Sequence, residues 1–156
     1  MTNNTEVLWY KSLNKKDILE LATTLSRHAI RAWNDFHLNS FSQHELKTLP
    51  ERALREIEST LNGSSTRNIR EHFTSFIPPV VHIRDGYLKY PYEVRLAFLS
   101  VFHILHGMVS TNGTAAKEAF CSSIKKSIDA IKLAGILTAE EIEQITNKYY
   151  QLSKTV

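Results

Sequence analysis

The stretch that decides the fold is residues 91–109, PYEVRLAFLSVFHILHGMV. Its apolar side chains recur at steps of three and four, which is one face of a helix with a 3.6-residue repeat. These residues are Val94, Ala97, Phe98, Val101, Phe102, Leu105, Met108 and Val109. Further apolar residues fill most of the opposite side. A helix that is apolar nearly all round belongs in the middle of a bundle, so we predict a buried central helix over 91–109.

A membrane span is the alternative interpretation of this stretch. Glu93, Arg95, His103 and His106 interrupt it. The run therefore falls short of the roughly 20 apolar residues that a bilayer core requires. We predict a core helix and no membrane partner.

The composition indicates one ordinary globular domain over residues 1–156. Apolar residues make up 42% and charged residues 22% of the chain, and there are only 5 Gly and 4 Pro, too few for the turns of a sandwich or barrel. The single cysteine, Cys121, excludes an internal disulfide, and we expect it to be a small buried residue. No signal-peptide pattern opens the chain; we expect residues 1–6 to be frayed and the protein to be cytoplasmic.

The net charge of +3 and the isoelectric point near 9.0 are mildly basic. No window gathers this charge into a block of like sign. A nucleic-acid partner is therefore permitted but not indicated.

Start and stop signals divide the rest of the chain into helices. Asn14 is a predicted N-cap of an amphipathic helix over about 15–35. The boxes SQHE at 42–45 and TLPE at 48–51 predict a short helical turn and then a helix that stops at Asn62-Gly63. A further helix is predicted to end at Pro78-Pro79. Thr114 and Thr138 are the predicted caps of the last two helices, with Gly135 closing the first of these. We expect an all-α bundle of six or seven helices.

Residues 80–90 are predicted to form an irregular loop or a small hairpin. Two apolar runs flank Arg84-Asp85-Gly86, and Asp-Gly favours a hairpin turn. Because a lone hairpin is only marginally stable, it would have to pack against the bundle.

The first candidate site is RNIREH at 67–72, which begins with Arg67 and Asn68 and ends with His72. This segment resembles the Arg…His signature of the HEPN superfamily, helical bundles that include metal-independent ribonucleases. The resemblance implies that His72 transfers the proton at the 2′-hydroxyl, that Arg67 stabilises the phosphorane, and that the active site spans a dimer interface. The alternative is a solvated helix face with His72 at its boundary. A similar spacing recurs from Arg31 to His37.

The second candidate is the pair His103 and His106, with His82 upstream. Two histidines at i and i+3 share a helix face and could hold a metal. Known catalytic zinc helices place a glutamate between histidines at i and i+4, which is absent here. We therefore interpret the pair as core histidines and expect neither metal nor cofactor.

The third candidate is a group of aromatic and basic residues around the Asp85-Gly86 turn. It consists of Arg84, Tyr87, Lys89, Tyr90, Tyr92 and Arg95. Tyrosine and arginine are enriched at protein interfaces. Alternatively, the rings cap the core while their hydroxyls remain in water.

These features favour a small non-enzymatic protein-binding or inhibitory module of the immunity-protein, antitoxin or adaptor type. Its partner would be another protein, such as a toxin or enzyme that it masks. The alternative is a HEPN-like ribonuclease that uses Arg67, Asn68 and His72. A homodimer is compatible with either function.

Overall fold

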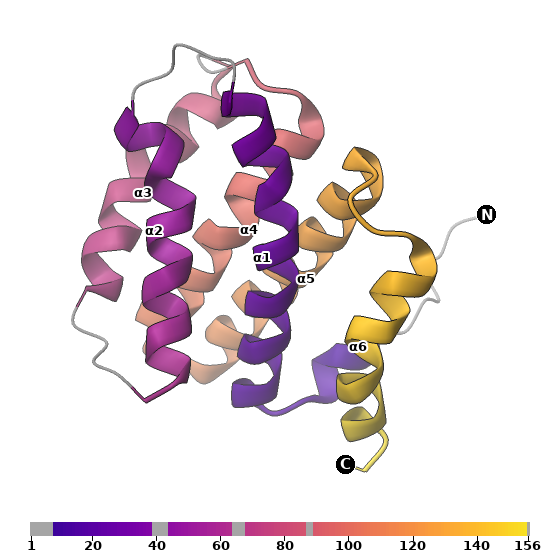
Figure 1. The fold of residues 1–156 in the computed structure, drawn as a ribbon. Coiled ribbons are helices and arrows are strands. Elements are labelled where there is room, and N and C mark those ends of the chain that lie inside the picture. The colour runs from indigo at the N-terminus through magenta and orange to yellow at the C-terminus, as the bar shows by residue number, and fades with distance from the viewer. Residues whose placement is uncertain (1–7, 39–43, 64–67, 87–88, 156) are drawn as a thin grey trace.

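The structure is a computed structural model that describes residues 8–38, 44–63, 68–86 and 89–155. Within these ranges the chain forms one short 3₁₀ helix and six α-helices, and no strand. In chain order they are η1 (Trp9–Ser12), α1 (Lys15–Leu38), α2 (His44–Leu61), α3 (Ile69–Arg84), α4 (Tyr92–Val109), α5 (Gly113–Ala134) and α6 (Ala139–Ser153). The predicted all-α bundle is confirmed. Figure 1 shows α1 and α2 side by side in front of α3 and α4, with α6 at the edge.

Helix α4 is the central helix that the sequence predicts. It packs against α1, α2, α3 and α5, and its buried residues include Val94, Phe98, Val101, Ile104 and Leu105. Pro91 occupies the N-cap position, so the helix begins at Tyr92. No helix in the described part of the chain is long and apolar enough to cross a membrane.

Local capping signals explain several helix ends. The Asn14 side chain accepts a hydrogen bond from the backbone N–H of Asp17 at 2.8 Å. Thr138 and Glu141 form the predicted capping box at the start of α6. Gly135 ends α5 with φ of +66°, a left-handed conformation that glycine adopts without strain. The predicted cap Thr114 is wrong: Asn112 caps α5 by accepting from Ala115, at 3.0 Å.

The prediction that a new helix starts after Thr48 is also wrong, because α2 runs unbroken from His44 to Leu61 and includes Pro50. Pro50 cannot donate a backbone hydrogen bond to the preceding turn. The Arg52 guanidinium adds hydrogen bonds in the same turns, to the carbonyl of Glu45 and the hydroxyl of Thr48, each at 3.2 Å. Leu49, Ala53, Leu54 and Ile57 are buried along the inner face and hold this helix against the bundle.

Helix α3 continues through Pro78-Pro79 to Arg84, where the sequence predicts an end. The loop expected over 80–90 is therefore shorter, and Val80–Ile83 are helical rather than extended. Pro78 and Pro79 have no backbone N–H, so the carbonyls of Thr74 and Ser75 lose their donors within the helix. Thr74 and Ser75 lie on the exposed side of α3, where water can replace these hydrogen bonds. Ile69, Phe76 and Ile83 are buried on the other side, and this packing outweighs the lost hydrogen bonds.

A cluster of four buried serines lies where α1, α4 and α5 meet. Ser26 of α1 donates to Ser100 of α4 at 2.9 Å, and Ser100 donates to the carbonyl of Ala97 at 2.8 Å. Ser26 also lies 3.3 Å from Ser123 and 3.0 Å from Ser127, both on α5. Because a hydroxyl accepts two hydrogen bonds and donates one, Ser26 can satisfy all three neighbours. The sequence signal for this cluster is serine at the inner-face positions of each helix.

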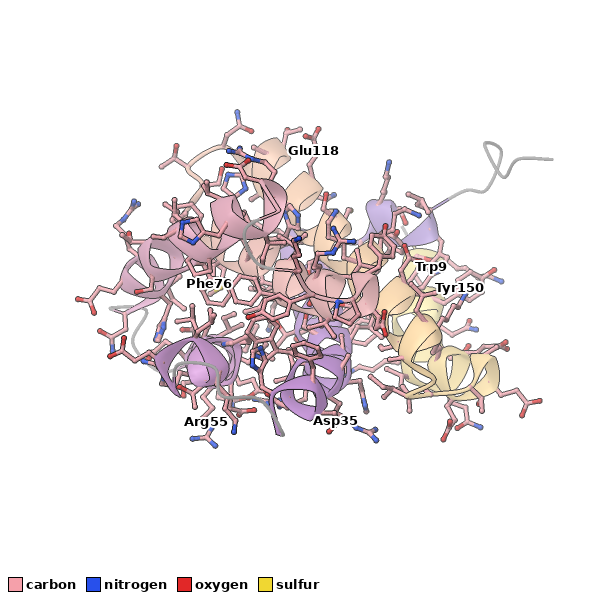
Figure 2. The ribbon with its side chains drawn as sticks, turned by 90° about the horizontal axis from the view of Figure 1, so that it is seen from above. Trp9, Asp35, Arg55, Phe76, Glu118 and Tyr150 are labelled. Atoms are coloured by element: carbon pink, nitrogen blue, oxygen red, sulfur yellow. The ribbon has the colours of Figure 1, made fainter. Side chains whose placement is uncertain are left out.

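The C-terminal helix is attached to the bundle through aromatic contacts. Trp9 of η1 lies edge-on to Tyr150 of α6, with ring centroids 5.4 Å apart (Figure 2). Tyr149 is buried and its hydroxyl donates to Glu20 of α1 at 3.4 Å. The apolar segment that precedes Asn14 therefore joins α6 to the rest of the fold.

Candidate functional site

An aromatic cluster forms one end of the bundle, where α1 ends and α4 begins. Trp33 is fully buried and donates its indole N–H to the carbonyl of Lys47 at 3.0 Å. Around Tyr90, the ring centroids of Trp33, Phe36 and His37 lie at 5.1, 5.2 and 5.3 Å. Burial raises the pKa of the Tyr90 hydroxyl. Tyr90 is thus held on several sides and fixes the start of α4.

Tyr92 extends from this support into solvent, and Arg95 lies half-buried beside it. Tyr92 is 56% exposed, and the guanidinium carbon of Arg95 lies 5.3 Å from the centre of its ring. This is cation–π geometry. The Arg95 Nε is buried and has no hydrogen-bond acceptor among the described residues, so one donor of its guanidinium is left unpaired.

Of the other three predicted residues of this surface, the structure describes Arg84 and Lys89. Arg84 is exposed and pairs with its neighbour Asp85 at 3.1 Å. Lys89 is exposed. Tyr87 lies outside the described residues. The structure adds one residue, Phe36, which is 37% exposed and contacts Tyr90 from α1. We call the set of Phe36, Arg84, Lys89, Tyr92 and Arg95 the aromatic–basic end.

The ribonuclease hypothesis cannot be completed from this geometry, because Arg67 lies outside the described residues. His72 is half-buried on α3, and burial lowers the pKa of its imidazole, with smaller effects from Glu56, Arg52 and Glu71. Asn68 is the polar residue that the resemblance places directly after Arg67. Its side-chain amide donates to the Glu56 carboxylate at 3.4 Å, so the amide already has a partner within the protein. The hypothesis remains a prediction.

The pair His103 and His106 occupies two different environments. His106 is exposed and stacks on Phe73 at 5.7 Å. His103 is largely covered; burial, together with smaller effects of Lys126 and His106, lowers its pKa to about 4. His82 is exposed on α3. No group of three His, Cys, Asp or Glu in the described ranges could hold a metal ion.

The lowered pKa of His103 predicts a loss of stability in acid. The unfolded chain takes up the proton near pH 6.5, whereas the folded chain does so only near pH 4. Stability is therefore fully present above about pH 6.5 and falls as the pH drops toward 4, by at most about 3 kcal/mol from this residue, and by less to the extent that solvent screens its exposed edge. Chemical denaturation at a series of pH values measures the loss.

His103→Gln should shrink this acid loss without removing it, because burial also lowers the pKa of His37. His106→Gln is the matched control, since it replaces an exposed imidazole on the same helix and keeps His103. If His103→Gln and His106→Gln reduce the loss equally, burial of His103 is not its cause.

An ion-pair cluster among the described residues joins α1 to α2 and is not part of the predicted sites. Arg27 donates through Nε and Nη2 to Glu58, at 3.0 and 2.6 Å, and through Nη1 to Glu51 at 2.7 Å. Arg55 also pairs with Glu51, at 3.0 Å. Because the Arg27 guanidinium binds a carboxylate on each of two sides, we interpret the cluster as structural.

No protein-family model, curated protein or solved structure matches the chain.

Proposed function

We propose that the protein is a non-enzymatic binding module whose aromatic–basic end contacts another protein. The observation that carries the proposal is the Tyr92–Arg95 pair, an exposed aromatic ring beside a guanidinium with an unpaired Nε, next to the packed rings around Tyr90. Tyrosine and arginine supply much of the binding free energy at protein interfaces. A Tyr side chain has few rotatable bonds, so little entropy is lost when a partner orders it.

The charges of this end indicate the chemistry of the partner surface. Between residues 84 and 95 the cations Arg84, Lys89 and Arg95 outnumber the acids Asp85 and Glu93, so electrostatic attraction toward an acidic surface is present but modest. The complementary patch would offer a pocket for the Tyr92 ring and a carboxylate for Arg95. A toxin or enzyme that the module masks would fit this description.

Tyr92→Ala should weaken the complex by about 2 kcal/mol, roughly 30-fold in Kd, which is the size of an interface hot spot. A partner is first captured with the wild-type protein, and its Kd is then measured for each purified variant. The matched control is Tyr150→Ala. Tyr150 is also a partly exposed ring, at 37%, with a Lys154 ammonium 4.6 Å from its centre, but it lies on α6.

A partner that binds wild type and Tyr150→Ala equally, and Tyr92→Ala much more weakly, would support the proposal. Equal binding by Tyr92→Ala and the wild type would refute it. Circular dichroism of both variants checks that the helices are intact.

A further inference from the structure

A half-open cavity of about 490 Å³ lies between η1 and the first half of α5. Ligand pockets span roughly 300–1,000 Å³. The cavity is lined by Leu8, Tyr10, Lys11, Thr114, Lys117, Glu118, Cys121, Ser122 and Lys125. It is remote in sequence from the aromatic–basic end and plays no part in the function proposed above.

One face of α5 supplies most of the lining. Positions 114, 117, 118, 121, 122 and 125 recur at steps of three and four, so they follow a single stripe along the helix. The buried residues Ala116, Phe120 and Ile124 lie on the core side. The lining stripe is therefore a second face of the helix, which meets η1 instead of the core.

The cavity carries an excess of positive charge. Lys11, Lys117 and Lys125 line it, with Glu118 as the one acid among the lining residues. Glu118 lies at the outer edge of the molecule (Figure 2). In the described part of the chain, none of the three ammonium groups lies in an ion pair. With three ammonium groups against one carboxylate around the cavity, its net positive charge attracts an anion.

The interior of the cavity is apolar. Leu8 and Cys121 are half-buried, and Tyr10 is only 5% exposed. Burial raises the pKa of the Cys121 thiol, against the opposing effect of Lys11 and Lys117. At neutral pH the thiol is thus uncharged and serves as apolar surface. Thr114 and Ser122 add hydroxyl groups to the lining.

We propose that this cavity binds a small organic anion, a phosphate or carboxylate group on an aromatic or short aliphatic body. Lys11, Lys117 and Lys125 bind the anionic group. Leu8, Tyr10 and Cys121 cover the apolar body. Both parts contribute to binding, so inorganic phosphate alone binds more weakly than phenyl phosphate.

Titration with phenyl phosphate and with benzoate, followed by backbone amide shifts, tests the proposal and separates phosphate from carboxylate recognition. At least one of the two should give saturable shifts at residues 8–11 and 114–125. Lys117→Gln should raise its Kd about tenfold or more, the loss expected for a charge-assisted hydrogen bond. The control Lys132→Gln removes an exposed lysine from the last turn of the same helix and should leave the Kd unchanged.

Cys121 gives a second measurement, because it is the only cysteine in the chain. An aromatic disulfide reagent forms a mixed disulfide with this thiol and releases its own aryl thiolate, which is measured by absorbance. The titrated anion should slow this reaction in the wild type and in Lys132→Gln, and much less in Lys117→Gln. Absence of saturable binding by both probes, equal loss in the two lysine variants, or binding of inorganic phosphate as tight as that of the organic anions would overturn the proposal.

Discussion

Phe98→Ala should lower the free energy of unfolding by about 3–5 kcal/mol, the largest stability effect we expect from a single substitution in this protein. Phe98 is fully buried in the middle of α4. Its ring centroid lies 4.7 Å from that of Trp33 and 4.6 Å from that of Phe76. Removing the ring leaves a cavity between two large side chains that are themselves fully buried and cannot move in to fill it. Urea denaturation monitored by circular dichroism measures the change.

Phe102→Ala is the matched control, one helical turn further along α4. Phe102 is only half-buried and stacks on Phe73 at 5.6 Å near the surface. Its loss should cost clearly less, because water and neighbouring side chains can occupy the vacated space. Equal destabilisation by Phe98→Ala and Phe102→Ala would show that the deeper burial of Phe98 does not set the cost of removing its ring.

Gly107→Val should destabilise the protein by about 3 kcal/mol or more. A Cβ added at Gly107 would overlap the Phe120 ring and lie 3.0 Å from the carbonyl oxygen of Ala116, both on α5. Phe120 is fully buried, so its ring cannot swing aside into solvent. Valine has a higher helix propensity than glycine, but this would stabilise the helix by less than about 1 kcal/mol. The destabilisation from overpacking is therefore larger.

Gly113→Val tests whether the effect is due to packing rather than to the loss of a glycine. Gly113 begins α5, and a Cβ there would meet nothing within 4 Å. This variant should unfold at nearly the wild-type denaturant concentration. A wild-type midpoint for Gly107→Val would mean that α4 and α5 do not approach as closely as the structure shows.

The parts of the fold that the sequence predicts are those governed by local patterns. The two-sided apolar character of residues 91–109 predicts the central helix, and the capping box of Thr138 and Glu141 predicts the start of α6. Local rules fail where tertiary packing outweighs them. Buried side chains before and after the prolines keep α3 helical through Pro78-Pro79 and α2 helical through Pro50, at the cost of some backbone hydrogen bonds.

Contacts between residues distant in sequence could not be predicted from the same patterns. The serine cluster joins Ser26 to Ser127 across three helices, and no local spacing reports that relation. Similarly, the grouping of Tyr92 with Arg95 follows from their i, i+3 spacing, whereas the contact of Phe36 with Tyr90 depends on how α1 meets α4. The sequence therefore predicts the members of the aromatic–basic end that lie on one segment, and only the fold adds Phe36.

Hydrogen exchange of the complex with a captured partner tests the proposed binding surface most directly. Because Tyr92 and Arg95 lie in the first turn of α4, their amides and those of the adjoining residues 84–91 should exchange more slowly in the complex than in the free protein. The amides of α6 should exchange at the same rate in both. Slower exchange confined to α6, or to the exposed side of α1 over residues 15–35, with unchanged exchange over 84–95, would contradict the account.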